Sequence, residues 1–390
     1  MKKAVIAIIW YVLILHVFIP CVYYLFMGFD PVYTDLVDLP SLYKSIFLIT
    51  ASLLLAIFVL NKSTKKDFVA TPIVNGKPIN FLYYFSIVFK LITFYLTGGF
   101  EALISGESSG SLANYFSLFL NPFTLLLLLL FVQKKKSSVI KAILFYVVYI
   151  TLSGSRSGII SIFFVFFIGM AFEGFKRYES KLLNFLKYGL LMAPALFVYA
   201  TLSRGINEVV GFDFIMNQIV GRMSTLETSM LPLYHESHDL DLSLFYSKYG
   251  FWHQIKLCID TLLPGQIFEF DVMPNNYYRA MFMGFSESFV RENYMSVNLT
   301  LPIYLYLKYG YFGILFTVLY ILGFYKLLVF FKNKPFVIII LLSTFYNLVY
   351  FFDWVMVFMQ LYSSLLTVLF VKGFILFYKT LKKSFVFKKI

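Results

Sequence analysis

The chain has 390 residues, of which 60% are hydrophobic, 21% aromatic and only 14% charged, and its formal net charge is +13. A soluble domain is about 45–50% apolar and about 25% charged, so this composition excludes a soluble globular protein and indicates several membrane-spanning helices. The two cysteines, Cys21 and Cys258, lie far apart in the sequence. They exclude a disulfide framework and a CxxC metal site.

The first apolar segment follows Lys2 and Lys3, as a signal sequence would. It is too long for the apolar region of a signal peptide and has no small-x-small cleavage site, so we interpret it as an uncleaved first span. A helix needs about 20 apolar residues to cross the hydrocarbon. The sequence predicts about ten spans, at residues 4–27, 42–60, 79–97, 112–132, 138–154, 157–175, 182–203, 311–331, 335–352 and 354–378. Pro122 and Pro194 are expected to kink the fourth and seventh spans.

The charges in the connecting segments predict the orientation of the spans. The segments assigned to the inner side hold most of the 33 lysines and arginines, but only Asp67, Glu173 and Glu179 among the 20 acidic residues. Cytoplasmic loops of membrane proteins are enriched in lysine and arginine, so both termini are predicted to be cytoplasmic. We expect no binding to nucleic acid, because the cations lie in short tethers and form no patch.

The predicted fold is an all-α, polytopic integral membrane protein with one membrane domain and one large outer loop. Residues 1–203 hold spans one to seven, residues 204–297 form the loop, and residues 298–390 hold spans eight to ten and a basic tail. The loop is far longer than an ordinary connection. Apolar residues recur at helical spacing over Phe212–Met230 and Ile255–Leu263, which predicts two amphipathic helices on the outer leaflet or on the bundle.

The stretch TLSGSRSGII places Arg156 in a Ser/Gly turn between spans five and six, on the outer side. Arginine at the membrane edge is costly and is usually paired, and its guanidinium can grip a phosphate or carboxylate with two hydrogen bonds. The alternative is an anchor at the interface. Arg204, in TLSRG, repeats this chemistry at the end of span seven. Arg279 and Arg291 lie in the large loop, where ion pairing with the many acidic residues is the competing interpretation.

The loop stretch YHESHDLDLS gathers two histidines and three acids. These are His235, Glu236, His238, Asp239 and Asp241. In a helix, the HxxH spacing would place both imidazoles on one face, and nearby carboxylates could complete a zinc or calcium site. The alternatives are a solvated polar loop, or a single side chain that acts as a general base.

Lys90, Lys44 and His16 are polar residues inside predicted spans that need an explanation. Lys90 is a candidate functional residue, which either pairs with an outer carboxylate such as Glu101 or extends to the membrane surface. Lys44, near a span end, is expected to extend to the surface. His16 is expected to be a hydrogen-bonded core residue.

Aromatic residues on the outer side suit the binding of sugars. Aromatic faces stack on the C–H surfaces of sugars, and asparagine amides hydrogen-bond their hydroxyls. The candidates are Trp252, Tyr277, Tyr278 and Asn276. The alternative for each aromatic residue is a place in the interfacial aromatic belt.

Together these features resemble the bacterial O-antigen and capsule repeat-unit polymerases, the Wzy group. The resemblance rests on SGSRSG between two mid-chain spans, lysine-rich inner tethers, a large late outer loop, and Ser296-Val297-Asn298 followed by LTLPIYLYLKYGYFG. It covers the whole chain as architecture, whereas its local motifs are short. Such polymerases are similar in fold to the O-antigen ligases, of the glycosyltransferase type C class.

The resemblance implies a glycosyltransferase of the bacterial inner (plasma) membrane that needs neither a metal nor a cofactor. It would transfer glycan from undecaprenyl diphosphate to the distal sugar of another lipid-linked repeat unit on the outer face. Arg156 would hold the diphosphate, assisted by Arg204 and by Arg279 or Arg291. The implied partners are the lipid-linked oligosaccharide, membrane lipid and a chain-length regulator protein.

Related ligases carry a histidine just before the asparagine of the 297–298 motif, where this chain has Val297. This difference favours a polymerase over a ligase and leaves the general base open. The candidates are Glu287, Glu292, His235 and Asp239.

Two other membrane functions remain as alternatives. One is a flippase that transports the repeat units, although flippases usually have short loops and more spans. The other is a membrane O-acyltransferase, in which a histidine late in the first span, here His16, is typical. Acyltransferases, however, usually have short outer loops.

Overall fold

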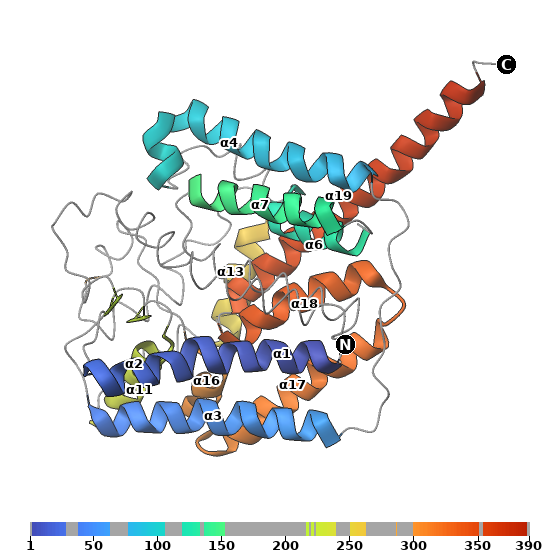
Figure 1. Cartoon of the computed structure of the whole chain (residues 1–390). Coiled ribbons are helices and arrows are strands. Elements are labelled where there is room, and N and C mark those ends of the chain that lie inside the picture. The colour runs from blue at the N-terminus through green and yellow to red at the C-terminus, as the bar shows by residue number, and fades with distance from the viewer. Residues whose placement is uncertain are drawn as a thin grey trace.

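The structure is a computed structural model that describes residues 2–28, 38–62, 77–105, 119–132, 136–152, 216–217, 220–221, 224–238, 250–262, 286, 299–350 and 354–387 (Figure 1). Every regular element in these ranges is a helix, which confirms the all-α class. Within them, four helices are long and apolar enough to cross a membrane: Lys2–Met27, Leu39–Lys62, Phe312–Phe330 and Gln360–Thr380. The protein is therefore membrane-embedded and helical.

Helices fill the described parts of the predicted spans. The first span is one continuous helix made of α1 (Lys2–Leu13), the π-helical turn η1 (Ile14–Phe18) and α2 (Ile19–Met27). The others are α3 (Leu39–Lys62), α4 (Lys77–Ser105), α6 (Pro122–Val132), α7 (Lys136–Leu152), α17 (Phe312–Phe330), α18 (Pro335–Tyr350) and α19 (Trp354–Phe387). The predicted spans 157–175 and 182–203 lie outside the described residues, so the total of about ten spans stays a prediction.

The helices α1 and α3 run antiparallel along one side of the bundle (Figure 1). Lys2 Nζ donates to the backbone oxygen of Asn61 at 3.4 Å and so joins the start of α1 to the end of α3. The buried positions of α3 include Ser45, Ser52 and Ala56. Small residues at this helical spacing let neighbouring helices approach closely, and such packing is a main source of helix association in lipid.

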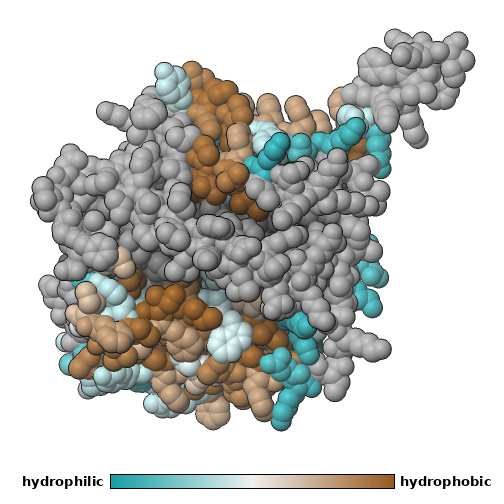
Figure 2. Space-filling model, in the orientation of Figure 1, coloured by the Kyte–Doolittle hydropathy of each residue, from teal (hydrophilic) through white to brown (hydrophobic). Residues whose placement is uncertain are grey.

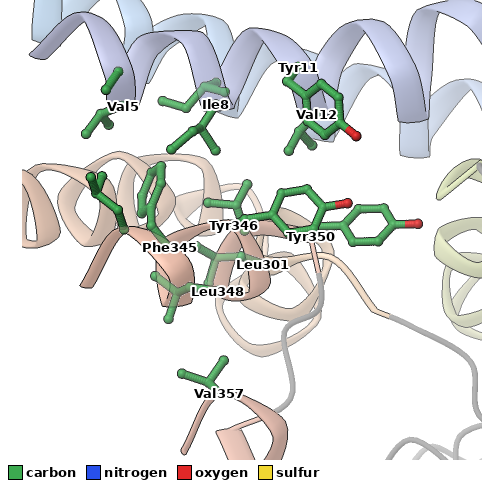
Figure 3. Close-up of a cluster of buried hydrophobic side chains, with 14 of the residues drawn as sticks. Val5, Ile8, Tyr11, Val12, Leu301, Phe345, Tyr346, Leu348, Tyr350 and Val357 are labelled. Atoms are coloured by element: carbon green, nitrogen blue, oxygen red, sulfur yellow. The ribbon is translucent and has the colours of Figure 1, made fainter. Parts of the chain in front are cut away.

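The core lies between α1 and α18. Figure 3 shows Val5, Ile8 and Val12 of α1 facing Phe345 and Tyr346 of α18. These side chains are buried. The buried residues of α1, among them Val5, Ile8 and Val12, recur at intervals of three and four and form an inward-facing stripe.

A short helix that the sequence analysis did not predict, α16 (Leu301–Tyr309), forms a hairpin with α17. The turn between them contains Gly310, whose φ of 59° is in the left-handed region that favours glycine. A Cβ atom at Gly313 would lie 2.5 Å from the backbone carbon of Leu305. The two helices are therefore in direct backbone contact at this glycine.

The helix α6 begins at Pro122, where the sequence analysis expected a kink. Asn121 precedes it, and its Oδ1 accepts the N–H groups of Phe123 and Thr124 at 3.0 and 3.1 Å. This is an N-cap followed by proline at the first helical position, where a missing N–H costs nothing. The Asn121 amide also donates to Ser363 Oγ of α19 at 3.2 Å. Residues 112–118 lie outside the described residues, so the kink of this span stays a prediction, but the helix is interrupted at Leu120 and Asn121, directly before Pro122.

The segment predicted as the large outer loop contains helices, as predicted, but α11 is buried differently from the prediction. The helix α13 (Phe251–Leu262) packs against α19, and its buried residues are Gln254 and Leu257. Ile259, expected on the buried face, is 38% exposed. The helix α11 (Leu226–Ser237) packs against α3, and residues 224–233 are all buried. Burial on every side is typical of a helix within a bundle rather than of an amphipathic helix on a leaflet.

The two ends of the described bundle differ. The N-terminus, the end of α3 and the α17–α18 turn lie at one end, on the right of Figure 1. The helix α3 ends at Lys62, and the turn contains Lys332 and Lys334. Hydrophilic residues gather on that side in Figure 2. We name it the lysine-rich end, and the opposite end, where α2 finishes and α3 begins, the Met27 end. The sequence predicts that the lysine-rich end faces the cytoplasm.

Candidate functional site

The candidate site is built on α11, which carries part of the large outer segment into the bundle. Ser224 Oγ accepts the N–H of Leu226, the first residue of the helix, at 3.0 Å. The N–H and the Oγ1 of Thr225 both donate to the backbone oxygen of His16, at 3.1 and 3.3 Å. These bonds fix the first turn of α11 to the first span.

The last turn of α11 is fixed at the Met27 end by an ion pair. Lys44 Nζ lies 3.0 Å from Glu236 Oε2. The same ammonium lies 4.7 Å from the ring centroid of Tyr306 on α16, within the range of a cation–π contact. We name these three residues the Lys44 cluster. It joins α3, α11 and α16, and it shows that Lys44 pairs with protein groups where the sequence predicted an extension to the membrane surface.

The ion pair is only partly buried. The side chains of Lys44 and Glu236 are 29% and 38% exposed. The pair therefore contributes about as much to stability as a surface salt bridge, about 0.2–1 kcal/mol. Its value for function is geometric, because it places a carboxylate and an ammonium at a fixed separation beside an aromatic ring.

His235 and His238 have different environments, although the HxxH spacing could have placed them together. Burial lowers the pKa of His235, and the neighbouring His238 lowers that pKa further. The His235 imidazole is thus neutral near pH 7 and able to accept a proton. His238 is exposed and stacks on Tyr234, with ring centroids 4.1 Å apart. In the described part of the chain, no three His, Cys, Asp or Glu side chains gather as metal ligands would.

His16 lies fully buried in the π-helical turn of the first span. Its Nε2 lies 3.0 Å from the hydroxyl of Tyr346, and its ring centroid lies 3.9 Å from that of Tyr350. The prediction of a hydrogen-bonded core histidine is confirmed. Single π turns inside α-helices are frequent at functional sites, and here the turn presents the backbone oxygen of His16 to Thr225.

Lys90 lies over the ring of Tyr149 on α7, with Nζ 5.8 Å from the ring centroid. Neither of the sequence alternatives included this aromatic neighbour. The side chain of Glu101, the carboxylate suggested as its partner, lies outside the described residues.

The other predicted site residues lie elsewhere. Trp252 is on α13 and is 73% exposed. That helix packs against α19, whereas α11 packs against α3, so Trp252 and His235 belong to different elements of the bundle. The following lie outside the described residues: Arg156, Arg204, Arg279, Arg291, Glu287, Glu292, Asp239, Tyr277, Tyr278 and Asn276.

Sequence reasoning missed the Lys44 cluster and the contact between Thr225 and His16. Lys44 and Glu236 are 192 positions apart, and no local pattern links them. Each of the two residues carried a signal of its own, because a lysine at the start of an apolar span and a glutamate between two histidines both need partners. The bond from Thr225 to a backbone oxygen had no sequence signal.

At the Met27 end, the Lys44 cluster brings together an ammonium, a carboxylate and an aromatic ring, and the same turn of α11 carries the neutral imidazole of His235. A neutral imidazole or a carboxylate can take the proton of an attacking hydroxyl group, and aromatic faces can hold a sugar ring. No protein-family model matches the chain, and no curated protein or solved structure matches it.

Proposed function

We propose that the protein is a polymerase of lipid-linked oligosaccharide repeat units at the outer face of a bacterial inner membrane. The observation that carries the proposal is the position of α11. This segment carries His235 and Glu236 in the last turn of α11 at one end of a membrane bundle, where Glu236 pairs with Lys44 beside Tyr306. Such a site suits substrates that keep a polyprenyl tail in the bilayer and a polar glycan outside it.

The proposed reaction transfers the growing glycan between two lipid carriers. The distal sugar hydroxyl of the acceptor attacks the anomeric carbon of the donor, and a new C–O bond forms. The bond from that carbon to the diphosphate breaks, and undecaprenyl diphosphate leaves with the electron pair. His235 takes the proton of the hydroxyl, because its imidazole is neutral near pH 7.

Negative charge grows on the leaving diphosphate in the transition state. Preorganised cations lower the barrier most when they lie where that charge develops. Arg156 is the proposed diphosphate ligand, supported by Arg204 and by Arg279 or Arg291. Trp252 and the tyrosines 277 and 278 are proposed to stack on the glycan, and a chain-length regulator is the proposed protein partner.

Complementation of a strain that lacks the gene tests the proposal. Wild type, His235→Gln and His238→Gln are compared at matched levels in the membrane, and the length distribution of surface polysaccharide is read on a gel. Glutamine keeps the approximate size of the imidazole and its hydrogen bonding but takes no proton near neutral pH. His238 is the matched control, because it is the same residue type on the exposed end of the same segment.

We expect wild type and His238→Gln to restore long chains, and His235→Gln to leave single repeat units. Long chains in the deletion strain itself would refute the polymerase. A full ladder from His235→Gln would refute only the assignment of the base.

The same strain separates the alternative functions. A flippase defect leaves repeat units on the inner face, so none reaches the cell surface. An acyltransferase defect leaves chains of full length that lack an acyl group. In an acyltransferase the buried His16 would be the candidate site residue, but its Nε2 lies at hydrogen-bonding distance from the Tyr346 hydroxyl.

A further inference from the structure

The helix α11 meets the first span far below the surface of the bundle. The continuous helix Lys2–Met27 has 26 residues. His16, whose backbone oxygen binds Thr225, lies about 16 Å from the Met27 end at 1.5 Å per residue. The hydrocarbon of a bilayer is about 30 Å thick. The first turn of α11 is therefore near half depth.

The length of α11 matches this depth. It has 12 residues and is thus about 18 Å long. Its last turn pairs with Lys44, which lies only about 7 Å along α3 from Leu39 at the same rise per residue. The helix therefore runs along α3 from half depth back to the Met27 end.

Burial decreases from the start of α11 to its end, as it must if the start of the helix is inserted into the bundle. Residues 224–233 are buried, residues 234–236 are partly exposed, and Ser237 and His238 are exposed. Glu227, in the first turn, is fully buried, where the N-terminal end of the helix dipole favours a carboxylate. A helix lying flat on a leaflet would instead bury one stripe along its whole length and keep Glu227 in water.

We propose that α11 is a re-entrant helix. Its first turn lies at half the depth of the bundle, and the helix returns from there to the surface at the Met27 end. Backbone that is not helical is tolerated at membrane depth only where protein or water satisfies its polar groups. The bonds made by Ser224 and Thr225 supply part of that requirement, and the π turn at His16 presents the acceptor.

This placement gives Thr225 a positioning role. Because Thr225 fixes the deep end of α11 and Glu236 fixes its outer end, the first span and α3 together set the position of His235. The positioning role rests on the proposed function, whereas the insertion of α11 does not.

Paired cysteines test the insertion in the full chain in membranes, after Cys21→Ser and Cys258→Ser remove both native thiols. The N–H of Thr225 lies 3.1 Å from the backbone oxygen of His16, so two cysteines at these positions are close enough to form a disulfide when a small membrane-permeant oxidant is added. The test pair is His16→Cys with Thr225→Cys. The control pair is His16→Cys with Ser237→Cys, at the opposite end of α11. Maleimide–polyethylene glycol then counts the thiols left free after denaturation.

Single cysteines at Ser229 and Ser237 test the burial without changing His16. Both positions carry serine on the same helix, one fully buried and one exposed. In intact cells, we expect an impermeant maleimide to label Ser237→Cys at least tenfold faster than Ser229→Cys. We expect the 16–225 pair to cross-link and the 16–237 pair to stay free. Failure of the 16–225 cross-link, or labelling of both serine positions at one rate, would overturn the proposal.

Two substitutions test the positioning role. Thr225→Val removes the hydroxyl donor and keeps the shape, whereas Thr225→Ser keeps the donor. At matched membrane levels we expect Thr225→Val to lower the yield of long chains about two- to tenfold, the range of one neutral hydrogen bond, and Thr225→Ser to restore it. Equal yields from wild type and Thr225→Val would refute the positioning role. Absence of long chains from wild type would refute the proposed function and leave the thiol results valid.

Discussion

The contact between α16 and α17 predicts a large effect of Gly313→Ala. The added Cβ would lie 2.5 Å from the backbone carbon of Leu305 and 2.5 Å from the backbone nitrogen of Tyr306. Carbon atoms in good contact lie about 3.5–4.0 Å apart. Backbone atoms cannot rotate away, so α16 must move by about 1 Å to reach that distance, and the Tyr306 ring must move with it.

The magnitude follows from two opposing terms. Overpacking of this kind costs typically about 1–3 kcal/mol and occasionally more. Replacing glycine by alanine inside a helix recovers about 0.5–1 kcal/mol. Gly323 on the same helix is the matched control, because a Cβ there would meet nothing within 4 Å. Gly313→Ala should therefore lower the stability, whereas Gly323→Ala should leave it unchanged or raise it.

Thermal unfolding in one detergent, followed by size-exclusion chromatography with fluorescence detection, measures the difference. We expect the midpoint of Gly313→Ala to fall by several degrees, and that of Gly323→Ala to equal or exceed the wild-type value. If both variants unfold at the same temperature, the reasoning from the close backbone approach is wrong.

Three further predictions concern other described contacts. Tyr346→Phe should destabilise the protein by about 1–3 kcal/mol and so lower its unfolding midpoint, because the buried His16 loses a hydrogen-bond partner. An unchanged midpoint would contradict this. Asn121→Ala should destabilise by about 1 kcal/mol through loss of the α6 cap, whereas Asn121→Asp should retain the cap. Burial lowers the pKa of His235 in the folded protein. As the pH falls below about 6.5, His235 of the unfolded chain therefore binds a proton before His235 of the folded protein does, and the stability of the fold should decrease there. His235→Gln should flatten this part of a plot of unfolding midpoint against pH, and a profile identical to that of wild type would show that His235 does not cause it.

Much of the membrane architecture could be predicted because apolar length and charge are local properties of the sequence. The first span begins at Lys2 and ends at Met27, within a few residues of the prediction 4–27. The span predicted at 311–331 is a helix from Phe312 to Phe330. In both cases, hydrophobic residues fill the segment and polar or turn-forming residues follow it.

The elements that the sequence analysis misplaced are short helices inside the bundle. Predicting α16 would have required knowing that Thr300 and Leu301 are buried by neighbours distant in sequence. The apolar spacing over Phe212–Met230 predicts one amphipathic face, but residues around Leu226 and Met230 are buried on every side, where α3 and α16 pack against α11. The hydropathy of a segment indicates that it is buried but does not tell which neighbouring helices bury it.

The candidate site was predictable only in part, for the same reason. The stretch around His235 was singled out as a source of a general base, and the structure gives this imidazole a lowered pKa. Its neighbour Glu236 gained a role only through Lys44, on a helix distant in sequence. The predicted diphosphate ligand Arg156 lies outside the described residues, so its role stays a prediction.

Polymerisation by purified protein in lipid nanodiscs tests the central claim most directly. Lipid-linked repeat units extracted from the deletion strain serve as both donor and acceptor, and wild type is compared with Arg156→Lys and Arg156→Ala. We expect wild type to make lipid-linked chains of several repeat units and to release one undecaprenyl diphosphate for each bond formed. Arg156→Lys should be much slower, because lysine keeps the charge but cannot form the bidentate hydrogen bonds that arginine forms with phosphate. Arg156→Ala should be slower still. Wild-type protein that releases no undecaprenyl diphosphate and makes no chain longer than one unit would contradict the account.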